Sequence, residues 1–311
     1  MMEISSGTEI GSYTIDRLLS RKGGMSNVYL AHETERPNYM VVVKLQKQDD
    51  QHSATFQDLL RDEARLLSKL RHPGVVRIYP VRHTRRVDYA ARAIQLEGHP
   101  WFYAMEYLAG DSLDNQISSL HQKMGTAWTV ELYYQLLTTI YYMHKVGYAH
   151  CDLKPGNLFL RYSPDRRTIP TLVIVDFGSA SSIRRGIGRL ALSPRYAPPE
   201  ALTALARDDL TPQELNLQPD RIDIWSLGAI FFELLTGQPL INTRNLAEIS
   251  TTLARGRLAR IRDIRPELHE SLDKLLAQML SRQVNDRPNI KEVIQAVEER
   301  IHSIRPPRIA R

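Results

Sequence analysis

The spacing of apolar residues changes near residue 110, and this change limits the folds that the chain can adopt. Up to about Tyr107 the pattern is strand-like, with short β-branched or aromatic runs at 41–43 and 101–105 bounded by glycine and proline signals. One helix interrupts it, because apolar residues recur at threes and fours from Phe56 to Leu70. Beyond residue 110 the spacing is helical. We therefore expect an α+β fold in which a small β-rich lobe precedes a larger α-helical lobe.

Length and composition are typical of a folded chain with about two compact units, since it has 311 residues, of which 42% are hydrophobic and 24% charged. No stretch approaches the roughly 18 consecutive apolar residues of a membrane span, and the first residues lack the features of a secretory signal. The single cysteine, Cys151, cannot form an internal disulfide. We predict a cytoplasmic protein, or the cytoplasmic domain of a longer membrane receptor.

The formal net charge of +6 comes from scattered arginines, most of which we interpret as solvent-exposed. Nucleic-acid binding would require a focused basic surface with stacking aromatics, whereas the tyrosines at 133–134 and 141–142 fall at helical spacing beside leucines. We therefore expect no nucleic-acid partner. An arginine-rich surface can still favour acidic substrates or an anionic membrane face.

Glu63 is the first residue whose position needs an explanation. It falls within the apolar stripe of the predicted helix, where the burial of an unpaired carboxylate is costly. Lys44 ends the apolar run 40–43, so a strand would deliver its ammonium to the interior edge of the small lobe. We predict an ion pair between the two residues. A lysine that extends to solvent beside a half-exposed glutamate is the alternative.

The segment from His150 to Asn157 combines an acid, a cation and an amide between a predicted helix and a predicted strand. Phosphoryl transfer needs a carboxylate near the attacking hydroxyl, a cation on the moving phosphate and oxygen ligands for Mg²⁺. Asp152, Lys154 and Asn157 supply these three groups. An ordinary polar turn is the alternative, but the Asp-x-Lys-Pro-x-Asn spacing is specific.

A second carboxylate, Asp176, follows the continuous apolar run 172–175 and precedes Phe177 and Gly178. Mg²⁺ prefers such hard oxygen ligands together with substrate phosphates. We expect Gly178 to allow a sharp turn after the acid. An aspartate in a plain turn is the alternative for this motif taken alone.

The glycine-rich segment gives the weakest of these signals. Gly23 and Gly24 form a single pair between Arg21 and Val28, whereas phosphate-binding loops commonly have several spaced glycines. A bare pair of glycines is more often a plain hairpin turn.

Taken in this order, the motifs resemble those of the protein kinase family, and especially the eukaryotic-like Ser/Thr kinases of bacteria. The resemblance covers nearly the whole chain; its matching segments are 23–31, Lys44, Glu63, 72–76, 105–107, 150–157, 176–178, 193–200, 223–228 and 285–288. It implies a bilobal catalytic domain at 13–303, with a small lobe at 13–107, a large lobe at 108–303, and flanking segments at 1–12 and 304–311.

The resemblance also implies a role for each residue of the site. Lys44 is expected to hold the α- and β-phosphates of ATP while it pairs with Glu63. Asp152 is expected to be the catalytic base, and Lys154 to contact the γ-phosphate. The adenine is expected to bind at the hinge after Met105, and the nucleotide-binding surface to include Gly23, Gly24, Val28, Ala104, Met105, Glu106 and Leu108.

By the same resemblance, the chain is a protein serine/threonine kinase that transfers the γ-phosphoryl group of Mg-ATP to protein hydroxyls in signal transduction and phosphorylates itself. Asn157 and Asp176 are the expected ligands of Mg²⁺, for which Mn²⁺ is an alternative. Lys154, two residues after Asp152, is typical of the Ser/Thr class rather than the Tyr class. The expected partners are ATP and protein substrates, and a kinase–kinase dimer is a further option.

Two structural contacts are implied as well. Glu200 and Arg287 are expected to form an ion pair in the large lobe. Asp223 is expected to brace the catalytic loop from a buried helix.

The sequence departs from the family pattern at four positions. Arg21 and Ser26 stand where glycines are usual, which is expected to restrict the loop and to alter nucleotide affinity. Cys151 replaces the arginine that usually precedes the base and contacts a loop phosphate, so we predict activity without obligatory loop phosphorylation. A plain packing role is the alternative for Cys151. We attach little weight to Pro198, which stands where an alanine is usual.

Two other functions compete with this interpretation. A pseudokinase binds nucleotide or partners without turnover; the degenerate glycine loop favours it, and the complete set of expected site residues disfavours it. A small-molecule kinase of similar fold is disfavoured by the motifs at 154–156 and 197–226.

Overall fold

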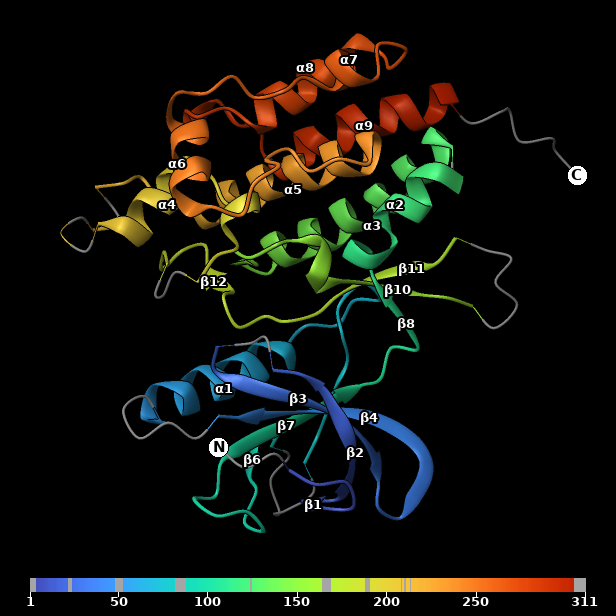
Figure 1. Ribbon diagram of the computed structural model, residues 1–311, viewed down its shortest axis with the longest axis vertical. Coiled ribbons are helices and arrows are strands. Elements are labelled where there is room, and N and C mark those ends of the chain that lie inside the picture. The colour runs from blue at the N-terminus through green and yellow to red at the C-terminus, as the bar shows by residue number, and fades with distance from the viewer. Residues whose placement is uncertain are drawn as a thin grey trace, which may run out of the picture. The chain divides into compact units, whose positions relative to one another are not determined.

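The computed structural model describes residues 4–304 except 22–23, 48–52, 82–87, 124, 164–168, 188–190, 208, 210 and 213. The chain forms two compact units, Met1–Arg71 with Val75–Ala109 and His72–Gly74 with Gly110–Arg311 (Figure 1). The first unit is mostly sheet and the second mostly helix, so the predicted α+β fold is confirmed.

The first unit is built on a seven-stranded sheet with the order β1-β2-β3-β4-β7-β5, in which β6 also pairs with β7. All of its pairings are antiparallel. Its strands are β1 (Glu9–Ile10), β2 (Tyr13–Ser20), β3 (Ser26–Glu33), β4 (Arg36–Gln46), β5 (Ile78–Tyr79), β6 (Ala91–Arg92) and β7 (Trp101–Glu106). Alternating residues of these strands form a buried core that includes Tyr29, Val41, Val43 and Phe102.

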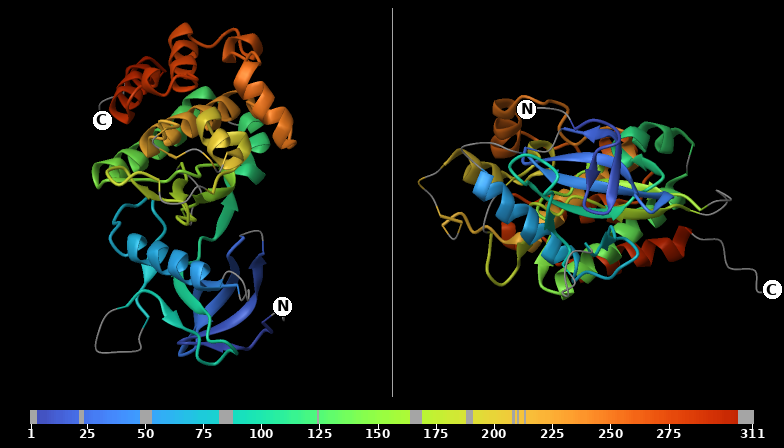
Figure 2. Two further views of the ribbon diagram at one scale, coloured as in Figure 1. Left: turned by 90° about the vertical axis from the view of Figure 1, so that its left-hand side faces the viewer. Right: turned by 90° about the horizontal axis from the view of Figure 1, so that it is seen from below.

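One helix of this unit, α1 (Ser53–Leu67), packs on the sheet and contacts β4 and β7 (Figure 2). Its buried face includes Leu60, Ala64 and Leu67, which recur at threes and fours as predicted. The helix ends three residues before the predicted Leu70. Tighter turns follow there, because the amide of Leu70 donates to the carbonyl of Leu67 rather than to the residue four positions earlier.

The second unit contains eight α-helices within the described part of the chain, along with short strands. The helices are α2 (Leu113–Lys123), α3 (Thr126–Lys145), α4 (Pro199–Ala206), α5 (Pro219–Thr236), α6 (Leu246–Arg255), α7 (Ile261–Ile264), α8 (Glu270–Met279) and α9 (Ile290–Ile304). The strands are β8 (Gly110–Ser112), β9 (Tyr148–Ala149), β10 (Leu158–Arg161), β11 (Thr171–Ile174) and β12 (Ser181–Ser182). They form a three-stranded sheet in the order β11-β10-β8 and a separate β9–β12 pair.

Helix α5 is the buried centre of this unit. It begins at Pro219, where a missing amide proton costs nothing, and ends before Gly237, whose φ of 70° is the left-handed conformation that closes many helices. Its residues are buried on nearly all sides, as the continuous apolar pattern predicted. The expected ion pair is also present: the Arg287 guanidinium donates to both carboxylate oxygens of Glu200 at 2.7 and 2.8 Å.

The segment His72–Gly74 belongs to the second unit although its neighbours belong to the first. The carbonyl of Gly74 accepts a hydrogen bond from the amide of Ile174 at 2.8 Å, next to β11. A Cβ atom on Gly74 would lie 2.1 Å from Oγ1 of Thr139 on α3, so only glycine permits this close approach. Within the described residues, the helices are all too short or too polar to cross a membrane.

Candidate active site

Lys44 and Glu63 form a buried ion pair in the first unit. Nζ of Lys44, near the end of β4, lies 2.8 Å from each carboxylate oxygen of Glu63, on α1. The two residues are only 8% and 5% exposed, which contradicts the alternative of a half-exposed glutamate. The lysine also lies over the ring of Tyr103, at 5.9 Å from the ring centroid. A buried pair of this kind persists because loss of either partner would leave an uncompensated charge.

The strands beside Lys44 place several predicted nucleotide-binding residues around it. In the sheet register Lys44 is opposite Val28 of β3 on one side and Tyr103 of β7 on the other. Ala104 and Met105 follow on β7, opposite Val43 and Val42 of β4. The sheet thus gathers Val28, Lys44 and the end of β7 on adjacent strands.

The hinge residues after Met105 differ in how their side chains are used. The carboxylate of Glu106 accepts a hydrogen bond from the amide of Arg77 at 2.8 Å, and the amide of Glu106 donates to the carbonyl of Arg77, also at 2.8 Å. The Glu106 side chain is therefore engaged by the neighbouring chain segment. Leu108 is buried. That the adenine binds to the backbone of this segment stays a prediction.

The glycine-rich segment is only partly described, and Gly23 lies outside the described residues. Gly24 is exposed, and a Cβ atom there would meet nothing within 4 Å. Neither Arg21 nor Ser26 has a positive φ, so the backbone at these two positions does not require glycine. The Nζ of Lys47 donates to the carbonyl of Arg21 at 3.1 Å and ties the start of the segment to β4.

In the second unit, Asp223 of α5 holds the loop that carries Asp152. Asp223 is fully buried, and its carboxylate accepts hydrogen bonds from the amides of His150 and Cys151 at 2.9 and 2.8 Å. A nitrogen of His144 lies 2.8 Å from the same carboxylate. The bracing role that the family resemblance implied for Asp223 is therefore confirmed. The Asp223 carboxylate holds this loop in a conformation in which Cys151 has a φ of 62°, which non-glycine residues rarely adopt.

Asp152, Lys154 and Asn157 meet within this loop. Nζ of Lys154 lies 2.7 Å from a carboxylate oxygen of Asp152, and the side-chain amide of Asn157 donates to the carbonyl of Asp152 at 3.0 Å. Lys154 also donates to the hydroxyl of Ser193 at 2.8 Å. Asp152 and Lys154 are half-buried, while Asn157 is buried within the 3₁₀ turn Pro155–Asn157. The loop thus presents a carboxylate and a cation side by side.

Asp176 follows β11 and is exposed, whereas Phe177 is buried 5.1 Å from the ring of His150, measured between centroids. The amide of Val175 donates to the carbonyl of Asn157 at 2.9 Å, which links the Asp176 segment to the loop of Asp152. The turn expected after Asp176 is present, since the amide of Ala180 donates to the carbonyl of Phe177 at 3.0 Å across Gly178. Gly178 has no positive φ, and it is Asp176 whose φ of 61° is left-handed.

The donor groups of Asn157 and Asp176 fit a divalent metal ion that is bound together with phosphates. Asn157 uses its amide nitrogen on the carbonyl of Asp152, so its amide oxygen is the atom suited to a cation. Asp176 offers an exposed carboxylate. Among the described residues no cluster of three or more His, Cys, Asp or Glu could hold a metal alone. This donor set suits Mg²⁺, which commonly takes one or two protein ligands and completes its shell with phosphates and water.

The predicted site residues therefore fall into two groups. Lys44 and Glu63 lie in the first unit, with the nucleotide-binding positions on β3 and β7. Asp152, Asn157 and Asp176 lie in the second, joined by hydrogen bonds. That both groups meet around one nucleotide stays a prediction.

Ser193 is a site residue that the sequence reasoning did not include. It is the first residue of the matching segment 193–200 and one of four serines between Asp176 and Glu200. Its hydroxyl accepts from Lys154 across a separation of 39 residues. The motif at 193–200 drew attention to this segment, but the spacing of its residues did not indicate that Ser193 contacts Lys154.

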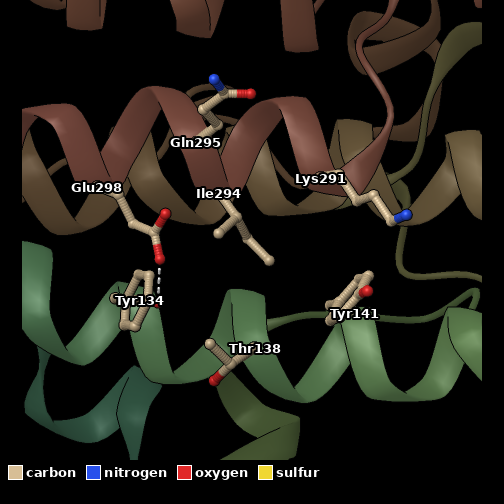
Figure 3. Close-up of a pocket in the computed structure, with 7 residues that line it drawn as sticks. All are labelled: Tyr134, Thr138, Tyr141, Lys291, Ile294, Gln295 and Glu298. Carbon is tan, nitrogen blue, oxygen red and sulfur yellow. Dashed lines mark hydrogen bonds between the residues drawn. The ribbon is translucent and has the colours of Figure 1, made fainter.

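A hollow of about 560 Å³ lies elsewhere in the second unit, between α3 and α9 (Figure 3). The hydroxyl of Tyr134 donates to Glu298 across it, and Lys291 lies over the ring of Tyr141 at 6.0 Å. Its lining residues are Tyr134, Thr138, Tyr141, Lys291, Ile294, Gln295 and Glu298. None of the predicted site residues lines this hollow, so it is separate from the proposed chemistry.

A family model described as the protein kinase domain matches residues 16–297. The chain belongs to the protein kinase family, whose members use ATP and a divalent metal ion to phosphorylate their substrates.

Three curated relatives illustrate where in this family the similarity lies. The chain is 28% identical over 293 residues to a calcium/calmodulin-dependent protein kinase type 1 of Macrobrachium nipponense, covering 90% of this chain and 75% of that protein. It is 27% identical over 273 residues to the CBL-interacting serine/threonine-protein kinase 12 of Arabidopsis thaliana, covering 86% and 49%. It is 28% identical over 242 residues to the ovarian-specific serine/threonine-protein kinase Lok of Drosophila melanogaster, covering 77% and 45%.

The chain thus spans about half the length of two of these relatives. All three come from eukaryotes, so the narrower resemblance to bacterial kinases stays a prediction.

Proposed function

We propose that this chain is a protein serine/threonine kinase that transfers the γ-phosphoryl group of Mg-ATP to Ser or Thr hydroxyls of proteins in signal transduction, and that it phosphorylates itself. The observation that carries the proposal is the contact between the carboxylate of Asp152 and the ammonium of Lys154, at 2.7 Å, on a loop braced by Asp223. A carboxylate near the attacking hydroxyl and a cation near the moving phosphate are two of the groups that phosphoryl transfer to an alcohol requires.

Asp152 is the proposed base. It orients the substrate hydroxyl and accepts its proton while the hydroxyl oxygen forms a bond to the γ-phosphorus. The bond from that phosphorus to the β–γ bridging oxygen breaks, and ADP leaves. Lys154 supplies positive charge to the transferred group from a position beside Asp152, and the hydroxyl of Ser193 holds its ammonium in place.

Lys44, Asn157 and Asp176 are the proposed nucleotide and metal ligands. Lys44, oriented by its bidentate contact with Glu63, binds the α- and β-phosphates. Asn157 and Asp176 hold Mg²⁺, or Mn²⁺, through their side-chain oxygens. The bound ion neutralises charge on the phosphates.

Several details complete the proposal. The catalytic domain covers residues 13–303, and the adenine binds at the backbone of 106–108. Lys154 two residues after Asp152 supports the Ser/Thr class, as do the names of two of the relatives. A kinase–kinase dimer would allow one copy to phosphorylate another. The degenerate glycine loop is the one sequence feature that favours the pseudokinase alternative. Against it, the expected catalytic side chains Lys44, Glu63, Asp152 and Lys154 are present and in contact in pairs.

The test is a radiolabel transfer assay. The purified chain is incubated with Mg²⁺ and γ-labelled ATP, alone and with a generic Ser/Thr substrate, and acceptor residues are identified by mass spectrometry. Asp152→Asn keeps the shape of the side chain but removes the base, so transfer should fall by roughly 100-fold or more. Asp62→Asn is the matched control, since Asp62 is exposed and contacts only Arg65 on its own helix among its described ion pairs. Equal transfer by wild type and Asp152→Asn, or none by either, would reject the proposal.

A further inference from the structure

Two arginines lie over the indole ring of Trp101, at the start of β7. The guanidinium carbon of Arg61, on α1, is 4.6 Å from the centroid of the indole ring, and that of Arg92, on β6, is 5.4 Å from it. Both distances fall within the range of cation–π attraction, for which tryptophan is the best aromatic partner. The indole nitrogen is buried without a hydrogen-bond partner in the described part of the chain. The ring therefore interacts through its faces rather than through its N–H group.

The strand that carries Trp101 also carries the aromatic residue beside Lys44. Trp101 and Tyr103 are two positions apart, so their side chains lie on the same face of the sheet. Nζ of Lys44 lies over the Tyr103 ring, and the amide of Trp101 donates to the side chain of Gln46, on the strand of Lys44, at 3.0 Å. Strand β7 thus contacts Lys44 through Tyr103 and, two residues away, contacts Arg61 of α1 through Trp101. Helix α1 also carries Glu63, the partner of Lys44.

We propose that the stack of Arg61, Trp101 and Arg92 fixes α1 on the sheet and thereby positions Glu63 for its contact with Lys44. Arg61 precedes Glu63 by two residues on α1, so its side chain leaves the helix on a different side and reaches β7 separately from the buried apolar stripe. The other ionic contact of Arg61 in the described residues, with Asp58 at 3.8 Å, is long and lies within the same helix. The stack is thus a second attachment of α1 to the sheet.

Arg61, Trp101 and Arg92 act through Glu63 and Lys44, so they are positioning residues and not catalytic ones. If α1 shifts, the bidentate contact loosens and Lys44 is released from Glu63. Loss of one partly exposed cation–π contact corresponds to about a two- to fivefold change in the equilibrium between the paired and unpaired states. The proposal concerns the geometry of the ion pair, and it rests on the proposed kinase function only for its kinetic consequences.

The first measurement does not depend on catalysis. An amine-reactive ester labels lysines, and mass spectrometry gives the rate at Lys44, which is slow while Glu63 and burial shield its ammonium. Arg61→Met keeps most of the side-chain length but removes the charge, so labelling of Lys44 should be about two- to fivefold faster. Arg61→Lys should restore the slow rate. Arg65→Met is the matched control, because Arg65 lies on the same helix, is exposed and pairs only with Asp62 among its described contacts to acids.

The second measurement is kinetic. The kcat/KM of Arg61→Met should fall by less than about twofold, because most molecules keep the ion pair when an equilibrium that favours it shifts two- to fivefold. This loss should disappear when Glu63 is already changed to Gln, since the stack acts through Glu63. Trp101→Phe, which keeps an aromatic face, should lie between wild type and Trp101→Leu in both assays, and circular dichroism confirms that each variant is folded. Unchanged Lys44 labelling in Arg61→Met, or an equal change in Arg65→Met, would overturn the proposal. A wild-type chain without transferase activity would reject the proposed function, while the labelling result would still decide this inference.

Discussion

The ion pair of Lys44 and Glu63 allows a test that separates the demands of folding from those of chemistry. Lys44→Met removes the cation and leaves the Glu63 carboxylate in a site where the two side chains are only 10% and 3% exposed. Removal of one partner of such a buried pair costs about 3–5 kcal/mol. At about 2–4 °C per kcal/mol, the midpoint of thermal unfolding should fall by about 6–20 °C. Lys69→Met, at an exposed lysine just after α1, should leave the midpoint unchanged.

The double variant Lys44→Met/Glu63→Leu shows whether the ion pair is needed for stability or only for phosphoryl transfer. It replaces both charges with apolar side chains of similar size, a change that is often neutral or stabilising in a protein interior. Calorimetry should therefore show a midpoint at or near that of the wild type, while the radiolabel assay finds no transfer by either variant. If the single variant is as stable as the wild type, or the double variant is no more stable than the single one, the pair does not have the uncompensated burial that we derive from the structure.

Three further predictions concern the second unit. Gly74→Ala should lower the free energy of unfolding by about 1–3 kcal/mol, measured with denaturant, because its Cβ would overlap Thr139; an unchanged stability would contradict the close approach. Burial, and after it the nearby Asp223 carboxylate, raises the pKa of the Cys151 thiol, so iodoacetamide at pH 8 should modify it only in the unfolded protein; prompt alkylation of the native chain would refute this. Phosphatase treatment should leave transferase activity intact, because Cys151 replaces the arginine that would bind a loop phosphate. Loss of activity that a loop phosphoserine restores would contradict the prediction that loop phosphorylation is not obligatory.

The residues that could be predicted from sequence are those whose chemistry conflicts with their surroundings. Glu63 interrupts an apolar stripe, so a cation had to be nearby, and Lys44 was the residue that a strand could deliver. Helix α5 is apolar on nearly all sides, and its burial followed from that pattern alone. In both cases the free energy of burial is large enough to dominate local preferences.

Other features depend on hydrogen bonds between segments far apart in the sequence, which a local pattern does not contain. One of them is the bond from the amide of Val175 to the carbonyl of Asn157, just before Asp176 with its left-handed φ of 61°. The contact of Lys154 with Ser193 depends on the path of the chain between them. Asp223 was assigned its bracing role from the family resemblance and not from the spacing of residues.

The chain segment after Asp176 gives a physical reason for activity without loop phosphorylation. Where the family usually has an arginine that binds a loop phosphate, Cys151 is buried and its amide is held by Asp223. The segment is instead fastened by neutral contacts: β12 pairs with β9, and the hydroxyl of Ser179 donates to the carbonyl of Ala191 at 2.7 Å. Ser193 then binds Lys154 directly. Each of these bonds contributes about 0.5–1.5 kcal/mol, so together they can supply the order that one phosphate–arginine contact would otherwise provide.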